Sequence, residues 1–277
     1  HLVKPKVIIS KNYAPRFDVL IAQNEPLEFV KTVPSETFVA TSLPNHSGKH
    51  LEKRSEFRKY LEWHDEVLKE CVRVLKPRGS LCFQAINYVG DQEIIPLDAF
   101  LGHLVRKNPS MRLRNRIIWV YDHRQRQGRH LPSGYEPVLW FTKGDRYTFN
   151  VDPIRVPQTY PGKRHYRGPK EGQLSGNPLG KNPGDLWDVL KVRADYLDTA
   201  DDWIQLPVHV FRRLVLAMTN RGDIVFDPFA GFGSCLVVAV LLNRRAVGVN
   251  SEKRYVQITK RRISQVVEGK LTLRDLY

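Results

Sequence analysis

Ile224-Val-Phe-Asp-Pro-Phe-Ala-Gly-Phe-Gly-Ser234 is the most informative stretch of the chain. An apolar strand ends at Asp227, the chain turns through Gly231 and Gly233, and an apolar helix follows from Ser234. Glycines let a backbone pass close to a ligand, and an acidic residue beyond a strand can accept hydrogen bonds from it. The stretch lacks the GK[ST] of a phosphate-binding P-loop. We therefore expect a βα unit with a ligand at its glycine turn.

The rest of the chain repeats this alternation of short apolar runs and longer stretches of helical period. Such alternation is typical of an α/β fold with a mostly parallel sheet. The strands that we expect span residues 18–22, 37–41, 80–85, 116–121, 136–142, 223–226 and 245–249. The expected helices span residues 26–33, 55–76, 97–105, 208–218, 234–242 and 252–267.

One stretch, residues 145–200, has a different character, since it is rich in Gly, Pro and Asn and shows little periodicity. Between residues 155 and 193 it carries eight basic residues against three acidic ones. A long insertion of this kind is usually functional or disordered, and its aromatic residues argue against disorder. We therefore divide the chain into one half over residues 1–144, an insertion over 145–200 and a second half over 201–277.

Composition narrows the class of partner. The 277 residues carry 44 Lys and Arg against 29 Asp and Glu, a formal charge of +15. This surplus favours a polyanion, nucleic acid first and an anionic membrane second, although solubility alone is the plain alternative. Three cysteines without a CxxC pair, and histidines without metal-ligand spacing, predict no disulfide framework and no metal site. With neither a secretory signal nor an apolar span, we expect a cytoplasmic, nucleoid-associated protein in a bacterium or a nuclear one in a eukaryote.

The string DPFAGFGS (227–234) resembles the cofactor motif of the β-class amino-methyltransferases of DNA, which use S-adenosyl-L-methionine. Similar stretches at 71–83, 135–150, 155–189 and 218–263 extend the resemblance from about residue 18 to 270. It implies a circularly permuted Rossmann-like methyltransferase fold, with a mixed seven-stranded sheet and helices on both faces. In this fold residues 1–144 would be the catalytic half, residues 145–200 an inserted target-recognition region, and residues 201–277 the cofactor-binding half of the same domain. It also implies double-stranded DNA as substrate, with a homodimer and a cognate restriction endonuclease as candidate partners and no membrane association.

The resemblance implies a set of residues around the cofactor. The loop comprises Asp227, Pro228, Phe229, Ala230, Gly231 and Gly233. Asn250 stands where the family has a ribose-binding carboxylate, and Glu252 is a substitute two residues later. Glu25 matches the acidic residue that would reach the adenine amine, although a carboxylate that favours a helix N-terminus is its alternative reading. Thr41 and Gln205 complete the set, and Trp203 is either a pocket wall or a core residue.

The catalytic tetrapeptide of the family, SPPY or DPPY, aligns with Ser42, Leu43, Pro44 and Asn45. Ser42 would accept a hydrogen bond from the target amine. Leu43 replaces a proline and Asn45 replaces the aromatic residue that stacks on the flipped base, an interaction worth about 1–3 kcal/mol. His46 could stack one position later. These departures leave open a methyltransferase-like subunit that binds DNA with impaired or no activity.

Basic and amide side chains are the expected contacts to DNA. From the insertion they are Gln158, Lys163, Arg164, Arg167, Lys170 and Asn177, with Gln158, Arg164, Arg167 and Asn177 as candidate base readers. Outside it they are Lys49, Arg124, Arg126 and Arg129. The expected function is methylation of the exocyclic N4 of a flipped cytosine in a specific DNA sequence. Serine at position 42 favours cytosine as a family tendency, N6 of adenine is the alternative, and RNA is a weaker one.

Overall fold

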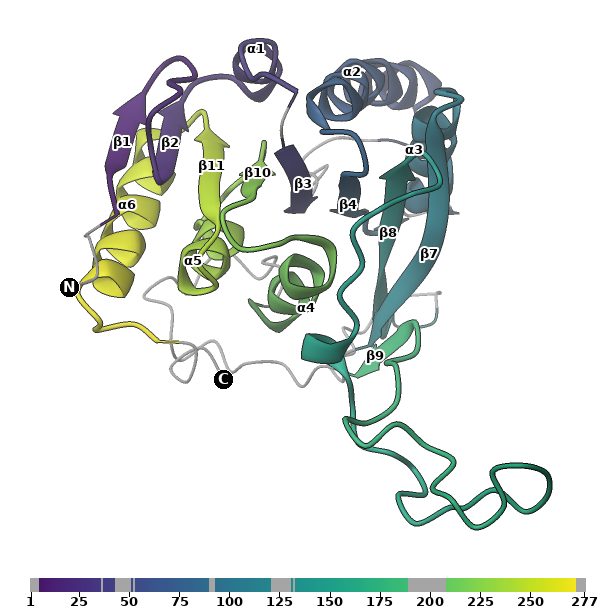
Figure 1. The fold of residues 1–277 in the computed structure, drawn as a ribbon. Helices are drawn as coiled ribbons and strands as arrows, with labels where there is room; N and C mark the ends of the chain where they lie inside the picture. Colours follow the sequence, from purple (N-terminus) through teal and green to yellow (C-terminus); the bar gives the residue numbers. More distant parts are fainter. Residues whose placement is uncertain are drawn as a thin grey trace.

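A mixed β-sheet flanked by helices on both faces forms the body of the protein in the computed structural model (Figure 1). The structure describes residues 5–35, 37–42, 51, 53–89, 93–120, 131, 133–188 and 208–272. Within them the main sheet has the strand order β1-β2-β11-β10-β3-β4-β8-β7-β9. The strands are β1 (Val7–Ser10), β2 (Val19–Gln23), β3 (Thr37–Ser42), β4 (Ser80–Gln84), β7 (Met111–Val120), β8 (Tyr135–Lys143), β9 (Leu186–Asp188), β10 (Ile224–Asp227) and β11 (Arg245–Asn250). β5 (Tyr88–Val89) and β6 (Ile94–Ile95) form a separate antiparallel pair.

All strands of the main sheet run in one direction except β8, which is antiparallel to both of its neighbours, β4 and β7. The centre of the sheet comes from the end of the sequence, because β10 and β11 lie between β3 and β2. The strands β2, β11, β10, β3 and β4 therefore end at one common edge. We call it the carboxyl edge.

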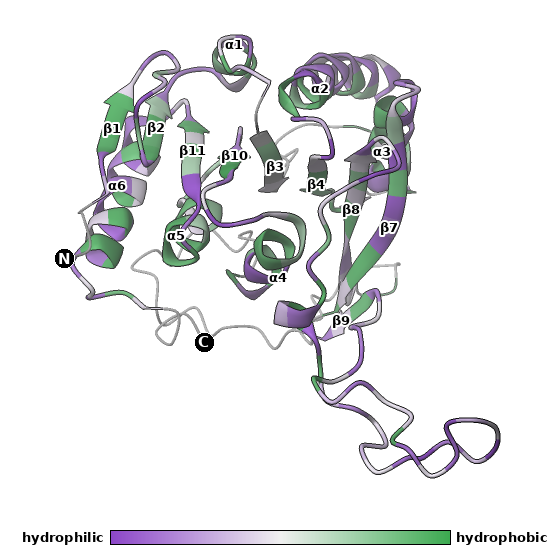
Figure 2. Ribbon diagram, viewed as in Figure 1, coloured by the Kyte–Doolittle hydropathy of each residue, from purple (hydrophilic) through white to green (hydrophobic). Residues whose placement is uncertain are grey.

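The helices divide between the two faces of this sheet. The helices α1 (Pro26–Val30), α2 (Arg54–Val74) and α3 (Leu97–Arg106) contribute to the hydrophobic cluster on one face. The helices α4 (Val208–Met218), α5 (Ser234–Leu241) and α6 (Lys253–Val267) contribute to the cluster on the other. α5 is apolar along its length, as Figure 2 shows, because it is buried between α4, α6 and the sheet. α2 buries a stripe of side chains at helical spacing, formed by Tyr60, His64, Val67, Leu68, Cys71 and Val72.

The predicted α/β class is confirmed, but the predicted count of seven strands is wrong, since the described sheet has nine. The two additional strands, β1 and β9, lie at the two edges. Both are too short for an alternating pattern, and each exists because a longer neighbour offers a free row of backbone groups. β7 also begins at Met111, five residues earlier than expected, because Arg112 and Arg114 make the start of this strand look like a polar loop.

The insertion contains two short elements, η1 (Asp152–Ile154) and β9, and between them an excursion that we call the arm, residues 156–181. Its two legs are joined at the root, where Val156 and Lys181 exchange backbone hydrogen bonds of 3.0 and 2.9 Å. The arm projects away from the body (Figure 1) and is mostly hydrophilic (Figure 2). Because β9 pairs with Ile118–Val120, the arm returns to the sheet beside the end of β7 that points to the carboxyl edge.

No helix among the described residues is long and apolar enough to cross a membrane.

Candidate functional site

The carboxyl edge brings together side chains that are far apart in the sequence. Asp227 is the last residue of β10, Asn250 of β11, and Ser42 of β3. Asn250 pairs in register with Gln23 of β2, and its carbonyl oxygen accepts a hydrogen bond of 3.1 Å from the amide of Asn24. Ligands of open α/β sheets bind beyond this edge. The glycine turn, Thr41 and Glu25 therefore surround one region.

Asp227 is fully buried at this edge. Its Oδ1 accepts a hydrogen bond of 3.0 Å from the amide of Phe229, and the hydroxyl of Thr41 donates another to the carboxylate. Both bonds favour the charged form, but burial outweighs them and raises the pKa of Asp227 from 3.8 to about 7. A cation beside this carboxylate would lower the pKa again. Asp227 is therefore suited to a positively charged ligand group.

The two glycines of the turn do different things. Both have a positive φ, +49° at Gly231 and +77° at Gly233, which favours glycine. A Cβ at Gly233 would lie 2.5 Å from Cγ2 of Thr259, so this glycine is required by packing against α6. A Cβ at Gly231 would meet only the Phe229 carbonyl oxygen, at 4.0 Å. Gly231 thus leaves open space above the backbone, where a ligand can approach.

Three side chains hold the turn from behind. The carbonyl oxygen of Gly231 accepts hydrogen bonds from Nδ2 of Asn250 at 3.0 Å and from Oγ1 of Thr259 at 3.3 Å. Nη1 of Arg262 donates to the Phe232 carbonyl at 2.7 Å and to Oγ of Ser234 at 3.1 Å. Arg262 is 6% exposed, and burial lowers its pKa to about 10. Thr259 and Arg262 were not predicted from the sequence, although both interrupt the apolar stripe of α6 and so gave a usable signal.

These contacts give Asn250 a reason to be an amide. A carboxylate at this position could not donate to the Gly231 carbonyl and would lie against its oxygen. Glu252, two residues later, is exposed just before α6 begins, and Glu25 lies just before α1 begins. Both carboxylates therefore lie at the carboxyl edge, just beyond the ends of the strands β11 and β2, which are on one side of β10.

The apolar part of the turn packs into the body. Pro228 and Ala230 are buried, and the amide of Ala230 donates to the Val249 carbonyl at 3.1 Å. The ring of Phe229 lies 5.7 Å from that of Trp63 on α2. Trp63 was not predicted as a site residue, because in the sequence it is one more aromatic residue on an amphipathic helix.

The end of β4 adds a polar pair that was not predicted from the sequence. Gln84 is buried in register with Ser42, and its amide donates a hydrogen bond to the carboxylate of Glu136 on β8. This hydrogen bond connects β4 to β8 beside Ser42, the residue that the family resemblance implies to be catalytic.

Several predicted site residues lie outside the described part of the chain. Ser42 ends β3, but its side chain lies outside the description. The others outside it are Leu43, Pro44, Asn45, His46, Lys49, Arg124, Arg126, Arg129, Trp203 and Gln205.

The candidate DNA contacts of the arm divide into two groups. Gln158 donates through Nε2 to the Asn177 carbonyl at 3.1 Å, and Nη1 of Arg164 donates to the Gly172 carbonyl at 2.5 Å. These two side chains stabilise the arm, because each bonds to the backbone of a distant part of it. The side chains of Lys163, Arg167 and Lys170 are exposed and make no hydrogen bond within the described residues. Asn177 accepts through Oδ1 from the amide of Leu179 at 2.9 Å, which makes it a turn residue.

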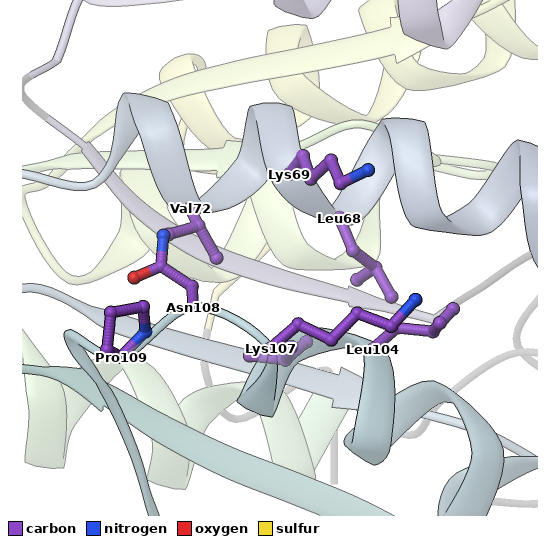
Figure 3. Close-up of a pocket in the computed structure, with 8 residues that line it drawn as sticks. Leu68, Lys69, Val72, Leu104, Lys107, Asn108 and Pro109 are labelled. Atoms are coloured by element: carbon purple, nitrogen blue, oxygen red, sulfur yellow. The ribbon is translucent and has the colours of Figure 1, made fainter.

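A hollow among the described residues lies away from the carboxyl edge. It has a volume of about 310 Å³ and lies between α2 and the end of α3 (Figure 3), where Asn108 and Pro109 precede β7. This is the opposite end of β7 from the carboxyl edge. Its two lysines, Lys69 and Lys107, face Asp65 at 2.6 and 3.7 Å. The hollow is therefore separate from the candidate site.

Among the described residues, no three His, Cys, Asp or Glu side chains lie together as a metal ion would require.

The family model N6_N4_Mtase, described as DNA methylase, matches residues 10–261. The chain belongs to this family of DNA methylases.

Relatives of this methylase include the type II methyltransferase M.BglII of Bacillus subtilis, 40% identical over 241 residues that cover 86% of this chain and 67% of the relative. The DNA adenine methyltransferase YhdJ of Escherichia coli is 30% identical, over 88% of this chain and 82% of the relative.

Solved structures share the fold of the methylase. A protein of Thermus thermophilus, described as a DNA modification methylase and complexed with S-adenosyl-L-methionine, superposes with a TM-score of 0.64 at 25% identity, over 90% of this chain and 94% of that one. The cytosine-N4-specific PvuII DNA methyltransferase superposes with a TM-score of 0.70 over 99% of this chain and 95% of that one. At 15% identity this second likeness shows the fold alone.

Proposed function

We propose that this methylase transfers the methyl group of S-adenosyl-L-methionine to an exocyclic amino group of a base in a specific sequence of double-stranded DNA. One observation supports the proposal most strongly: the carboxyl edge combines the buried carboxylate of Asp227 with open space above the backbone of Gly231. It occurs in a chain of the N6/N4 DNA methylase family. The cofactor supplies an activated methyl group on a positively charged sulfur.

The residues at the edge fit this cofactor. Its methionine part carries an ammonium group, for which the Asp227 carboxylate is a natural partner. The space above Gly231 admits the ligand close to the backbone. Glu252 and Glu25 are carboxylates that can accept hydrogen bonds from ribose hydroxyls and from the adenine amine, respectively. Asn250 would then act mainly by holding the turn.

The protein would catalyse the reaction by positioning and hydrogen bonding. An amine conjugated into a base ring is a poor nucleophile, because its lone pair is delocalised into the ring. Ser42 and the backbone after it would accept hydrogen bonds from the amine and favour a tetrahedral nitrogen. The amine nitrogen would then take the methyl group as the methyl–sulfur bond breaks and a neutral thioether leaves, and it would lose a proton to water. The reaction requires the target base to flip out of the DNA stack. Because Asn45 stands where the family has an aromatic residue, the flipped base loses a stacking partner and flipping becomes less favourable.

Cytosine N4 is the first candidate for the target atom, because Ser42 stands where the N4 enzymes of the family tend to have serine. Adenine N6 is the second candidate, favoured by the 30% identity to the adenine methyltransferase YhdJ. A DNA-binding subunit without activity is the third, favoured by Leu43 and Asn45. A homodimer and a cognate endonuclease stay predictions for this chain.

Cofactor binding tests the role of Asp227 directly. Asp227→Asn keeps the shape of the side chain and its acceptor for Thr41, but removes the charge. A hydrogen bond to a charged group contributes about 1.5–3 kcal/mol, so we expect binding of S-adenosyl-L-methionine, measured by calorimetry, to weaken roughly 10- to 150-fold.

Asp145→Asn is the matched control, since Asp145 is 79% exposed and lies at the other end of β8 from the carboxyl edge. It should bind like the native protein. Equal affinity of Asp227→Asn and the native protein would contradict the proposed site.

A further inference from the structure

The arm and its root carry three arginines, and two of them are already engaged by the protein itself. Arg164 donates to the Gly172 carbonyl. Arg155, at the root, donates to Oδ1 of Asp152 at 2.7 Å and to Oδ1 of Asn182 at 2.7 Å. These contacts consume donors that a base reader would need. Arg167 differs from both.

Arg167 is exposed at the tip of the arm, and its guanidinium lies over an aromatic ring. Its guanidinium carbon lies 5.3 Å from the centre of the Tyr166 ring. Tyr166 itself is 82% exposed. The guanidinium of Arg167 makes no hydrogen bond within the described chain. The N–H donors of this guanidinium are therefore available to a ligand.

The backbone of the tip is closed by its own hydrogen bonds. The amide of His165 donates to the Gln173 carbonyl at 2.8 Å, and Gly172 donates to the His165 carbonyl at 3.0 Å. Inside this ring Glu171 donates to the Gly168 carbonyl at 2.9 Å, and Gly168 has a φ of +87°. Arg167 thus projects from a turn whose shape is fixed before any ligand binds, which lowers the entropy lost on binding.

A planar guanidinium with free edge donors matches one base edge best. Guanine presents O6 and N7 in the major groove as two adjacent acceptors, and arginine binds them with two parallel hydrogen bonds. We propose that Arg167 reads a guanine in the DNA sequence that this methylase recognises. The inference rests on the proposed function, because it takes duplex DNA as the substrate.

The neighbouring cations are suited to a different role. Lys163 and Lys170 are exposed point charges on flexible stems, which fit phosphates rather than a base edge. Glu171 places a negative charge on the same tip, which disfavours a surface that binds phosphates alone.

Arg167→Lys tests the inference, because it keeps the charge but replaces the planar pair of donors with one ammonium on a flexible stem. Duplexes with randomised sequence would be selected by binding to the full chain and then sequenced, and the same pool would be assayed for methylated bases. We expect the native protein to prefer G·C at one position by roughly 5- to 150-fold, as a bidentate pair gives. Arg167→Lys should reduce this preference, because the ammonium reaches guanine without the rigid pair of donors, and it should keep the salt dependence of binding.

Two controls separate readout from charge. Lys163→Gln with Lys170→Gln should keep the sequence preference and reduce the slope of log K against log salt by about 0.9 for each phosphate that is no longer neutralised. Arg106→Gln, an exposed arginine at the end of α3, should change neither.

An unchanged preference in Arg167→Lys, or native binding without any preference for G·C, would overturn the inference. Because the selection reads binding, a native protein that selects sequences but methylates none would refute the proposed function and leave the assignment of Arg167 standing.

Discussion

Asp227 is the buried acid of the candidate site. Its burial makes the free energy of unfolding depend on pH. Its pKa is raised from 3.8 to about 7 when the chain folds, so between these values the folded state binds the proton more tightly than the unfolded state. The free energy of unfolding contributed by this group therefore falls as pH rises from about 4 to about 7.

Asp227→Asn removes this dependence, since the amide does not titrate. We expect the native protein to lose about 2–3 kcal/mol more unfolding free energy than the variant when the pH is raised from 5 to 8. Urea unfolding at the two pH values measures it. A difference that does not change with pH would show that the carboxylate is charged in the folded state throughout.

Single residues also show what the sequence could and could not predict. The string from Asp227 to Gly233 indicated the turn and its acid, because an acid and two glycines between a strand and a helix have few other uses. The different roles of Gly231 and Gly233 could not be predicted, since Thr259, which makes a side chain at Gly233 impossible, comes 26 residues later.

At the scale of elements, α6 acts as the support of the cofactor turn. Arg262 is buried without a carboxylate partner among its described hydrogen bonds, which go to a backbone carbonyl and a hydroxyl. Burying a cation in this way is costly, so the bonds to Phe232 and Ser234 must be retained once the fold has formed. We infer that Arg262 positions the turn through these two contacts.

Arg262→Met removes both bonds and leaves the Phe232 carbonyl buried without this donor. We expect a loss of about 1–3 kcal/mol in unfolding free energy and weaker binding of S-adenosyl-L-methionine, whereas Arg262→Lys should recover part of both. Binding measured well below the unfolding midpoint separates the two effects. If Arg262→Met loses stability but binds the cofactor as the native protein does, α6 has only a structural role.

The helices and central strands could be predicted because their periodicity is long or their burial complete. Short elements could not. β9 has three residues, and its pairing is decided by Ile118–Val120 of β7, 68 residues earlier in the chain. The hydrogen bonds by which Gln158 and Arg164 stabilise the arm could not be predicted either. Polar side chains in a loop give the same sequence pattern whether they bond to their own backbone or to DNA.

At the scale of the whole molecule, the sheet places the candidate cofactor site and the arm toward the same edge. β10 and β11 carry the turn at the centre, and β7 and β9 lead to the arm at one end. The net charge of +15 favours the approach of DNA to such a surface and makes binding sensitive to salt. The hollow between α2 and α3 lies away from this edge.

Transfer of labelled methyl from S-adenosyl-L-methionine to unmethylated genomic DNA, followed by separation of the nucleosides and mass spectrometry, tests the proposed activity of the whole molecule. We predict a labelled base methylated on its exocyclic nitrogen. N4-methylcytosine would support the first candidate and N6-methyladenine the second. A protein that binds the cofactor and the DNA but labels neither base would contradict the proposed activity and identify a binding subunit, with Leu43 and Asn45 as the first residues to restore.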